Sequence, residues 1–328
     1  MPIMTLEEIE NLSFEALGRA GASDLAARSV ARSIRRAEAD GLRPIGLGFL
    51  PTYLVHLASG KVDGGAVPAV ARPRPATVTV DAAHGFAHPA FDAGLDPLIT
   101  AARACGTASL AISRSYSIGV LGHPVEDIAN AGLVAIAVTN GPPNIAPWGG
   151  RTPLFGTNPM GFAVPRRGGL PLIIDQAASV ATKVALLNAA KTGEAIPAGW
   201  AFDAEGRETR DPQAALQGSM AAFGGAKGAN LALLVDLLAG GLTGANFSKD
   251  ASPYGKADGP PPGVGQFFIA FEPDAFAPGF LERVEEIAAA MLAQDGVRLP
   301  GDRRLAARAR IALEGVAVPD ELLATIAA

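Results

Sequence analysis

The spacing of apolar residues over the first forty positions predicts two amphipathic helices. Thr5 followed by Glu8 fits a helix N-cap, and apolar side chains then recur every three or four residues. Ser23 can begin a second helix that reaches about Asp40 with its apolar residues on one face. Prolines and glycines interrupt the pattern over 41–60, which predicts a loop leading into a short helix.

Further along, apolar runs of strand length alternate with helical ones. The segment TVTVDAAHGF is typical of an edge strand, and buried strands are predicted at 107–113, 133–139 and 265–271. Helices are predicted at 92–105, 124–131, 177–193, 230–242 and 278–294, the last being expected to end the helical pattern. No internal repeat is present. The chain therefore reads as an α/β protein, with helical ends wrapped around a mixed sheet.

The stretch from Pro147 to Ser179 differs from both patterns. Its twin glycines, Gly-Thr-Asn-Pro tetrapeptide and two short apolar runs predict strands joined by polar turns. Because Pro159 restricts the residue before it, we expect Asn158 to be extended, with the amides of 156–158 turned outward. Such amides suit a phosphate or a carboxylate. The alternative is an ordinary hairpin loop.

Composition narrows the class of protein. The 328 residues are 49% hydrophobic and 18% charged, with a formal net charge of -5, which favours a protein of two or three domains with large cores. An acidic chain without a basic face argues against nucleic acid as a partner. No run of residues is long and apolar enough to span a membrane, and the N-terminus does not fit a signal peptide.

The single cysteine indicates the cellular setting. Cys105 lies in the apolar segment ARACGTASLAI, where we expect a buried structural thiol rather than a nucleophile. One cysteine cannot build a disulfide framework, and a cytoplasmic location is therefore expected.

A second candidate anion site lies at Gly224 to Gly228, ahead of a predicted helix. The free amides of the first turn, the partial positive charge of the helix and the Lys227 ammonium can converge on a phosphate. The segment has neither Walker spacing nor the G-x-G-x-x-G of a Rossmann fold. The alternative is that the glycines only allow close helix packing.

The four histidines do not indicate a metal site. His56, His84, His88 and His123 show no metal-ligand spacing with a second histidine or cysteine. His56 is expected to be structural. His84 and His88 follow a strand, where each can line a pocket or cap a turn.

Seven blocks of the chain, in this order, carry a resemblance to a known family. They are GLVAIAVTN, IAPWGGRTPLFGTNP, PLIIDQAAS, IPAGWAFDAEG, DPQAAL, GGAKGANLALLVDLLAGGLTGA and GVRLPGDRR. The chain resembles the malate/L-lactate dehydrogenase family, which includes sulfolactate and ureidoglycolate dehydrogenases and the piperideine/pyrroline-2-carboxylate reductases. The similarity covers nearly the whole sequence.

The resemblance implies a non-Rossmann NAD(P)-binding fold, a homodimer and an active-site cleft. It implies a helical and dimerisation domain from 1–71 with 278–328, an NAD(P)-binding domain from 72–123 with 165–277, and a small α/β portion at 124–164 that completes the cofactor cleft. The cofactor, NADP or NAD with a mild preference for NADP, is expected at Thr157, Asn158, Pro159, Asp175, Ala177, Ser179, Lys227, Gly228 and Arg303.

The sequence departs from the family at the residues that transfer protons. Many members have Ser-His-Gly, then an arginine before Leu-Pro-x-x-Tyr, whereas this chain has Pro44, Ile45 and Gly46, then Phe49. Ser117 stands where dehydrogenase members have the histidine of Asn-x-His-Phe-Gly. Both family histidines are therefore missing.

Other residues are candidates for these roles. For proton transfer or substrate hydrogen bonding the candidates are His84, Tyr116, Ser117 and Asp203. For binding the substrate, a carboxylate clamp above all, they are Arg43, Tyr53, Arg151 and Lys183.

A ketone needs a proton at oxygen when it is reduced, whereas a protonated imine needs little beyond hydride. The missing histidines therefore favour an NAD(P)H-dependent reductase of a small 2-oxo or cyclic 2-imino carboxylate. One alternative is a 2-hydroxy-acid dehydrogenase of the malate, lactate or sulfolactate type. Another is a relative that binds the cofactor without turnover.

Overall fold

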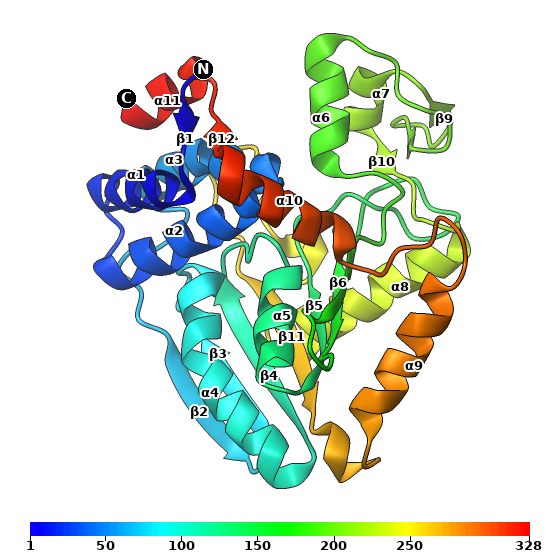
Figure 1. The fold of residues 1–328 in the computed structure, drawn as a ribbon. Helices are drawn as coiled ribbons and strands as arrows, with labels where there is room; N and C mark the ends of the chain where they lie inside the picture. The colour runs from blue at the N-terminus through cyan, green and yellow to red at the C-terminus, as the bar shows by residue number, and fades with distance from the viewer.

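A seven-stranded mixed sheet forms the centre of the molecule (Figure 1). The computed structural model describes residues 1–328. Only β3 and β4 run parallel, and every other neighbouring pair is antiparallel. In order across the sheet the strands are β2 (Ala69–Arg74), β3 (Thr77–Asp81), β4 (Thr107–Ser115), β11 (Val264–Phe271), β5 (Val134–Thr139), β6 (Met160–Val164) and β7 (Leu172–Gln176). The predicted α/β class with a mixed sheet is confirmed.

Two helices cover one face of this sheet (Figure 1). They are α4 (Ala87–Cys105), which connects the parallel pair β3 and β4, and α5 (Gly122–Asn130). Between them and the strands lies the largest hydrophobic core, 24 buried residues that include Leu110 and Phe268. Burying this much apolar area is the main driving force for folding of this part of the chain.

The other face is covered by α8 (Ala226–Asp236), which continues into the π-helix η3 (Leu237–Leu242). Here Ala239 packs with Val138 and Phe267. Because side chains alternate along a strand, Phe267 and its neighbour Phe268 face opposite sides of the sheet. Because both faces of the sheet are covered at its centre, β11 is apolar at every position except Gln266.

Both ends of the chain form a helical body above the sheet (Figure 1). Its elements are β1 (Ile3–Met4), α1 (Leu6–Arg19), α2 (Asp24–Ala39), α3 (Leu50–Ala58), α10 (Asp302–Glu314), β12 (Val316–Ala317) and α11 (Asp320–Ala327). The pairing of Ile3 with Ala317 joins the two ends. Thr5 and Glu8 form the predicted capping box at the start of α1.

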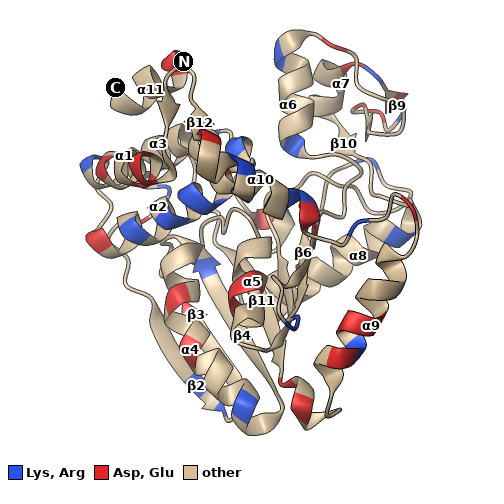
Figure 2. Ribbon diagram, viewed as in Figure 1, with Lys and Arg blue, Asp and Glu red and all other residues tan.

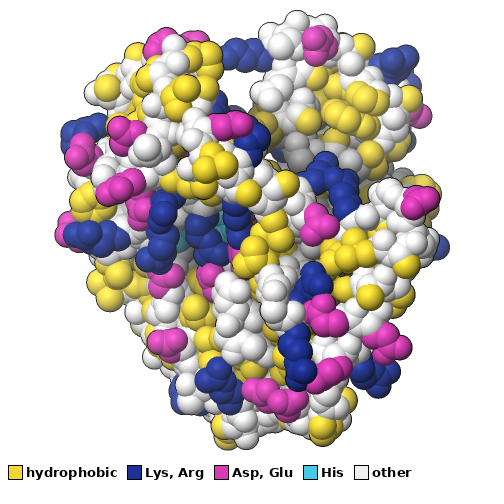
Figure 3. All heavy atoms as spheres, in the orientation of Figure 1, with side chains coloured by type: hydrophobic (Ala, Val, Ile, Leu, Met, Phe, Trp, Pro, Cys, Tyr) yellow, Lys and Arg dark blue, Asp and Glu magenta, His cyan; other side chains and the backbone are white.

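A small lobe stands apart from the helical body, at the upper right of Figure 1. It contains α6 (Lys183–Thr192), β8 (Ala201–Phe202), β9 (Glu208–Thr209), α7 (Pro212–Gln217) and β10 (Ser219–Met220). Its core has nine buried residues, and Ile145 and Phe155 from the loop before β6 belong to it. Figure 3 shows a hollow between this lobe and the helical body.

Several expectations about elements need correction. The segment 278–294 is not the last helix, because α9 (Phe280–Leu292) is followed by α10 and α11. The helix expected at 177–193 begins only at Lys183. The strand of TVTVD is not at the edge, since β2 covers it.

Cys105 is exposed rather than buried, because it falls on the outer side of the last turn of α4. None of the helices is both long and apolar enough for a membrane crossing.

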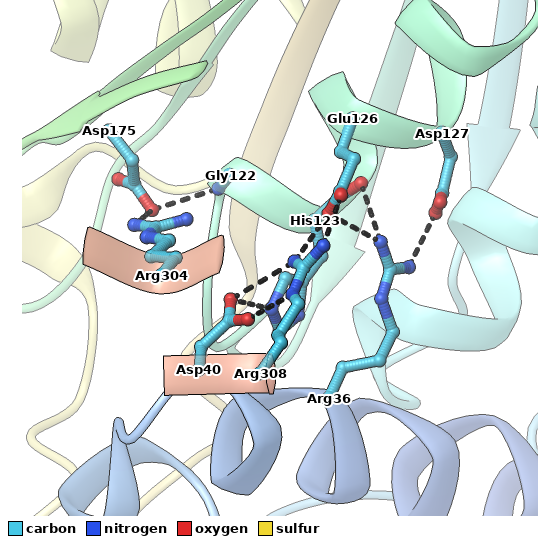
Figure 4. A network of polar contacts seen from close by, with 9 residues as sticks. All are labelled: Arg36, Asp40, Gly122, His123, Glu126, Asp127, Asp175, Arg304 and Arg308. Atoms are coloured by element: carbon cyan, nitrogen blue, oxygen red, sulfur yellow. Dashed lines mark hydrogen bonds and ion pairs between the residues drawn. The ribbon is translucent and has the colours of Figure 1, made fainter. Parts of the chain in front are cut away.

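A buried ionic network connects the helical body to α5 (Figure 4). Arg308 of α10 binds Asp40 at the end of α2 and, with both terminal nitrogens, Glu126 of α5. The side chains of Asp40 and Glu126 are at most 4% exposed. In Figure 2, basic segments of α2 and α10 face acidic segments of α5. Arg308 therefore lies between two carboxylates that water does not reach, and each has a second partner, Arg36 for Glu126 and His123 for Asp40.

Arg36 extends the same network from the middle of α2. Its guanidinium binds Glu126 and Asp127 and also donates to the backbone oxygen of His123. Burial acts to raise the pKa of Glu126, but the hydrogen bonds and charge of Arg308, together with the charge of Arg36, hold it below its ordinary value. Three segments distant in sequence thus meet through charge-assisted hydrogen bonds.

Replacing Arg308 by methionine should destabilise the protein by about 3–5 kcal/mol, because the change removes the arginine partner of Asp40 and the bidentate partner of Glu126, both of them buried. Arg310→Met, on the same helix, removes only an exposed pair with Glu314 and should cost less than about 1 kcal/mol. Urea unfolding at neutral pH measures both. Equal losses for the two variants would show that the buried network does not stabilise the fold.

Candidate active site

The loop predicted to bind an anion is built differently from the expectation. Asn158 is not extended: it has a φ of 41° and is fully buried. Its amide donates to the backbone oxygen of Ala232 at 2.7 Å, and its Oδ1 accepts from Ser248. Asparagine tolerates the left-handed region that most residues avoid, and these bonds hold it there. Asn158 therefore joins the start of β6 to α8, and its side chain is directed inward.

The backbone at Gly156 is also directed toward the protein interior. A Cβ at this position would lie 2.6 Å from the Gly141 oxygen, which only glycine allows. Thr157 is half-buried, and its backbone oxygen accepts from the amide of Ala178 at 2.8 Å. Pro159 is half-buried too, and its oxygen accepts from Thr139. The Gly-Thr-Asn-Pro segment thus connects β5, β6 and α8 through buried hydrogen bonds and close packing.

The two candidate anion loops lie together. Trp148, which is 68% exposed, covers Gly225, so that a Cβ there would lie 3.1 Å from the indole ring. Ser179 bridges to Ala222, and Phe223 donates to the Ala178 oxygen at 2.9 Å. Sequence segments near 148, 178 and 224 therefore meet at the start of α8. Tertiary contacts, and not sequence proximity, create this surface.

The start of α8 has the features expected of an anion site. Lys227 is exposed in the first turn and forms no ion pair. Gly228 is buried, and a Cβ there would lie 2.1 Å from the Phe223 oxygen, so that only glycine fits. A free ammonium beside unpaired first-turn amides attracts a phosphate. Ala177 and Ser179 border the same region, although the Ser179 hydroxyl already donates to the Ala181 oxygen.

A third element of this surface lies where β7, α5 and α10 meet (Figure 4). Asp175 accepts from the Gly122 amide at 2.9 Å and from Arg304 at 2.8 Å. The other terminal nitrogen of Arg304, Nη1, is buried without a partner. An unpaired guanidinium nitrogen at a helix start is suited to a negatively charged group. Arg303, the predicted residue, is exposed on the same turn, and the structure adds Arg304 as a second candidate.

An exposed isoleucine takes the place of the first family histidine, and the family arginine is replaced by a member of an aromatic cluster. Pro44 and Ile45 lie exposed on the turn η1 (Arg43–Ile45), and Phe49 in the next turn, η2 (Leu47–Phe49), packs edge-on against Tyr53 and Tyr254. Arg43 pairs with the buried Glu38 and is not a free cation. Burial raises the pKa of Glu38, although it accepts a hydrogen bond from the Leu47 amide.

Tyr116 and Tyr53 belong to this cluster. Both are buried, and their rings lie 5.8 Å apart. The Tyr116 hydroxyl is 2.5 Å from Nδ1 of His56, whose Nε2 lies 3.0 Å from the Lys256 oxygen. Burial raises the pKa of both phenols and lowers the pKa of His56. Ser117 is half-buried beside Tyr254, a residue that the sequence gave no reason to select.

The other candidates lie elsewhere. His84 has a φ of 65° beside Arg114 and Asp81, where its Nδ1 is buried without a partner. Asp203 holds the turn after β8 by accepting from the Arg207 amide, the first cause of its lowered pKa. Arg151 packs on Gly206 in the same lobe. Lys183 begins α6, and burial lowers its pKa. The structure therefore brings together Tyr53, Tyr116 and Ser117, whereas Asp203 lies in the small lobe.

The comparisons with known proteins agree with this architecture. The profile described as malate/L-lactate dehydrogenase matches residues 4–327. A (2R)-3-sulfolactate dehydrogenase (NADP(+)) of Chromohalobacter salexigens is 47% identical over 306 residues, covering 93% of this chain and 92% of that protein. A Delta(1)-pyrroline-2-carboxylate reductase of Ancylobacter novellus is 42% identical, covering 99% and 96%.

The protein belongs to the malate/L-lactate dehydrogenase family.

Among solved structures, the delta1-piperideine-2-carboxylate reductase of Pseudomonas syringae pvar. tomato superposes on this family member with a TM-score of 0.94. The two are 38% identical, and the alignment covers 99% of each chain. The family and the fold predicted from the sequence are thus confirmed. The roles of individual site residues stay predictions.

A polar cavity of about 40 Å³ lies between α2, α4 and α5. His88 and His123 line it, and His88 has no hydrogen-bond partner on either ring nitrogen. A cavity of this size holds a few water molecules, which can satisfy these nitrogens. Burial lowers the pKa of His88 to about 4, against the opposing effect of Asp92.

The protein should lose stability as the pH falls, in part because of His88. Its pKa in the folded state lies below the unfolded value of about 6.5, so protons bind preferentially to the unfolded chain between pH 6.5 and 4. Between pH 7 and pH 5 this coupling should cost the wild type about 2 kcal/mol more than His88→Leu. Urea unfolding at the two pH values measures the difference, and parallel losses would contradict the assignment.

Proposed function

We propose that this protein is an NADPH-dependent reductase of a small cyclic 2-imino carboxylate. Membership of a dehydrogenase family makes it an NAD(P)-dependent oxidoreductase. The observation that carries the choice of substrate is the absence of both family histidines, at Ile45 and Ser117, beside an aromatic cluster of Phe49, Tyr53, Tyr116 and Tyr254. Relatives named as pyrroline- or piperideine-2-carboxylate reductases support it.

The chemical argument concerns the proton. Reduction of a ketone creates an alkoxide that must be protonated, whereas a protonated imine becomes a neutral amine on receiving hydride. Burial raises the pKa of the phenols of Tyr53, Tyr116 and Tyr254 and so makes them poor acids. Both ring nitrogens of His56 already form hydrogen bonds within the protein. A site of this kind suits an imine, whose reduction does not demand a strong proton donor.

The cofactor would lie on the surface where the three loops meet, and when bound it supplies the hydride. Lys227 and the first turn of α8 would hold one phosphate, and Arg304 with the start of α5 another. Thr157, Asp175, Ala177 and Ser179 border this surface. NADP is preferred because a further exposed basic residue, Arg303, can meet a 2′-phosphate. The NADP(+) in the name of the sulfolactate relative agrees with this choice.

A second candidate function is a 2-hydroxy-acid dehydrogenase. It is favoured by the 47% identity to the sulfolactate dehydrogenase. That activity needs a base for the substrate hydroxyl, for which His84, whose backbone amide donates to the Arg114 oxygen, is the candidate. We also propose, on the family resemblance, a cytoplasmic homodimer. Analytical ultracentrifugation tests the dimer.

Purified protein should oxidise NADPH, followed at 340 nm, when supplied with cyclic imino carboxylates, and should turn over pyruvate, oxaloacetate and sulfopyruvate poorly. Turnover of the keto acids alone would favour the dehydrogenase. Tight NADPH binding without turnover would indicate a non-catalytic relative. Failure to bind either nicotinamide cofactor would refute the assignment altogether.

Lys227→Met should raise the KM for NADPH by about tenfold, since one phosphate contact is worth about 1–2 kcal/mol. The KM for the imine should change little. Lys191→Met, which removes an exposed lysine at the end of α6, is the matched control and should behave as the wild type. An unchanged NADPH affinity in Lys227→Met would move the phosphate site elsewhere.

A further inference from the structure

A buried lysine fastens the loop that follows η4 (Ser248–Asp250). Lys61 is 1% exposed, and its ammonium donates to the backbone oxygens of Pro253 (2.7 Å), Lys256 (2.6 Å) and Asp258 (3.1 Å). The three donors of the ammonium are all used, and no carboxylate takes part. A buried charge satisfied only by backbone oxygens of one loop constrains the conformation of that loop.

His56 holds the same loop from α3. The Lys256 oxygen can only accept, so the nitrogen 3.0 Å away, Nε2, carries the hydrogen. In the neutral ring Nδ1 is then the acceptor, and the Tyr116 hydroxyl donates to it. The Tyr116 hydroxyl therefore donates its hydrogen bond to His56 and is unable to donate to a substrate at the same time.

Tyr254 lies between the two carbonyl groups that Lys61 binds most closely. Its ring centroid is 5.1 Å from that of Tyr116 and 6.3 Å from that of Phe49. Its phenol is next to the Ser117 hydroxyl, which lowers its pKa against the larger raising effect of burial. Phe49 and Ser117 are the positions at which the family resemblance expects an arginine and a histidine. The loop thus brings a hydroxyl to the place from which both charged groups are missing.

We propose that Lys61 and His56 clamp this loop so that Tyr254 binds the substrate, donating a hydrogen bond from its phenol to the carboxylate of the imino acid. The proposal rests on the proposed function. Tyr254 stays protonated at neutral pH and acts as a donor, whereas the hydride comes from the cofactor. The faces of Phe49 and Tyr254 receive the apolar ring carbons of the substrate.

This arrangement also defines the substrate class. A hydroxyl and aromatic rings can hold one carboxylate, but they do not neutralise a second anionic group. A monoanionic ring with one carboxylate therefore fits better than a dianion such as sulfopyruvate, whose sulfonate would lie against aromatic surface without a partner. Tyr254 is in this way a residue that determines specificity.

The test is Tyr254→Phe assayed with Delta(1)-piperideine-2-carboxylate and NADPH. We expect the KM for the imine to rise about tenfold, kcat to stay within about twofold and the Kd for NADPH, from fluorescence quenching, to stay unchanged. An imine KM equal to that of the wild type would overturn the proposal while the proposed function stands. If the wild type binds NADPH but turns over no imine, both are overturned.

The clamp has a readout that does not depend on turnover. Lys61→Met should increase deuterium exchange at the amides of 254–258 and raise the imine KM in the same direction as Tyr254→Phe. Lys249→Met removes an exposed lysine just before the loop and should leave both quantities unchanged. Unaltered exchange in a folded Lys61→Met would overturn the clamp. If that variant does not fold, the Tyr254→Phe result decides.

Discussion

The contact between Arg308 and the two buried carboxylates of Asp40 and Glu126 is the interaction on which the rest of the arrangement depends. It joins the end of α2, the middle of α5 and the C-terminal helix α10, which are separated by more than 80 residues from one another. Four residues earlier on α10, Arg304 reaches Asp175 and the start of α5. The same helix therefore stabilises the core and shapes the surface proposed for the cofactor.

This coupling has a physical consequence for the cleft. Buried charges tolerate little displacement, because a lost partner leaves an uncompensated charge in a medium of low polarity. The helical body is thereby held in fixed register against α5 and the sheet edge at β7. A cofactor site assembled from α5, β7, α8 and α10 needs that register, since each element supplies only one or two groups.

The proposed substrate region follows a different principle. Around Tyr116 the contacts are aromatic, and the polar groups are used within the protein: His56 on Tyr116, Lys61 on backbone oxygens, Glu38 on the Leu47 amide. Where the family resemblance expects an arginine, Phe49 instead packs edge-to-face against Tyr254. The surface proposed for the cofactor is thus basic, and the region proposed for the substrate is aromatic.

Local sequence determined the element types wherever one short-range signal was sufficient. The capping box at Thr5, the apolar run of β11 and the glycines before α8 follow from periodicity and backbone preference, and the seven blocks determined the family. Asn158, Cys105 and TVTVD were misjudged because a hydrogen bond to Ala232, the rotation of the last turn of α4 and the pairing with β2 are all set by neighbours distant in sequence. For the same reason only the tertiary structure added Arg304 as a candidate beside Arg303 and brought Tyr254 to Ser117: nothing local distinguishes adjacent arginines or a tyrosine in a Pro/Gly loop, whereas burial against a distant partner does.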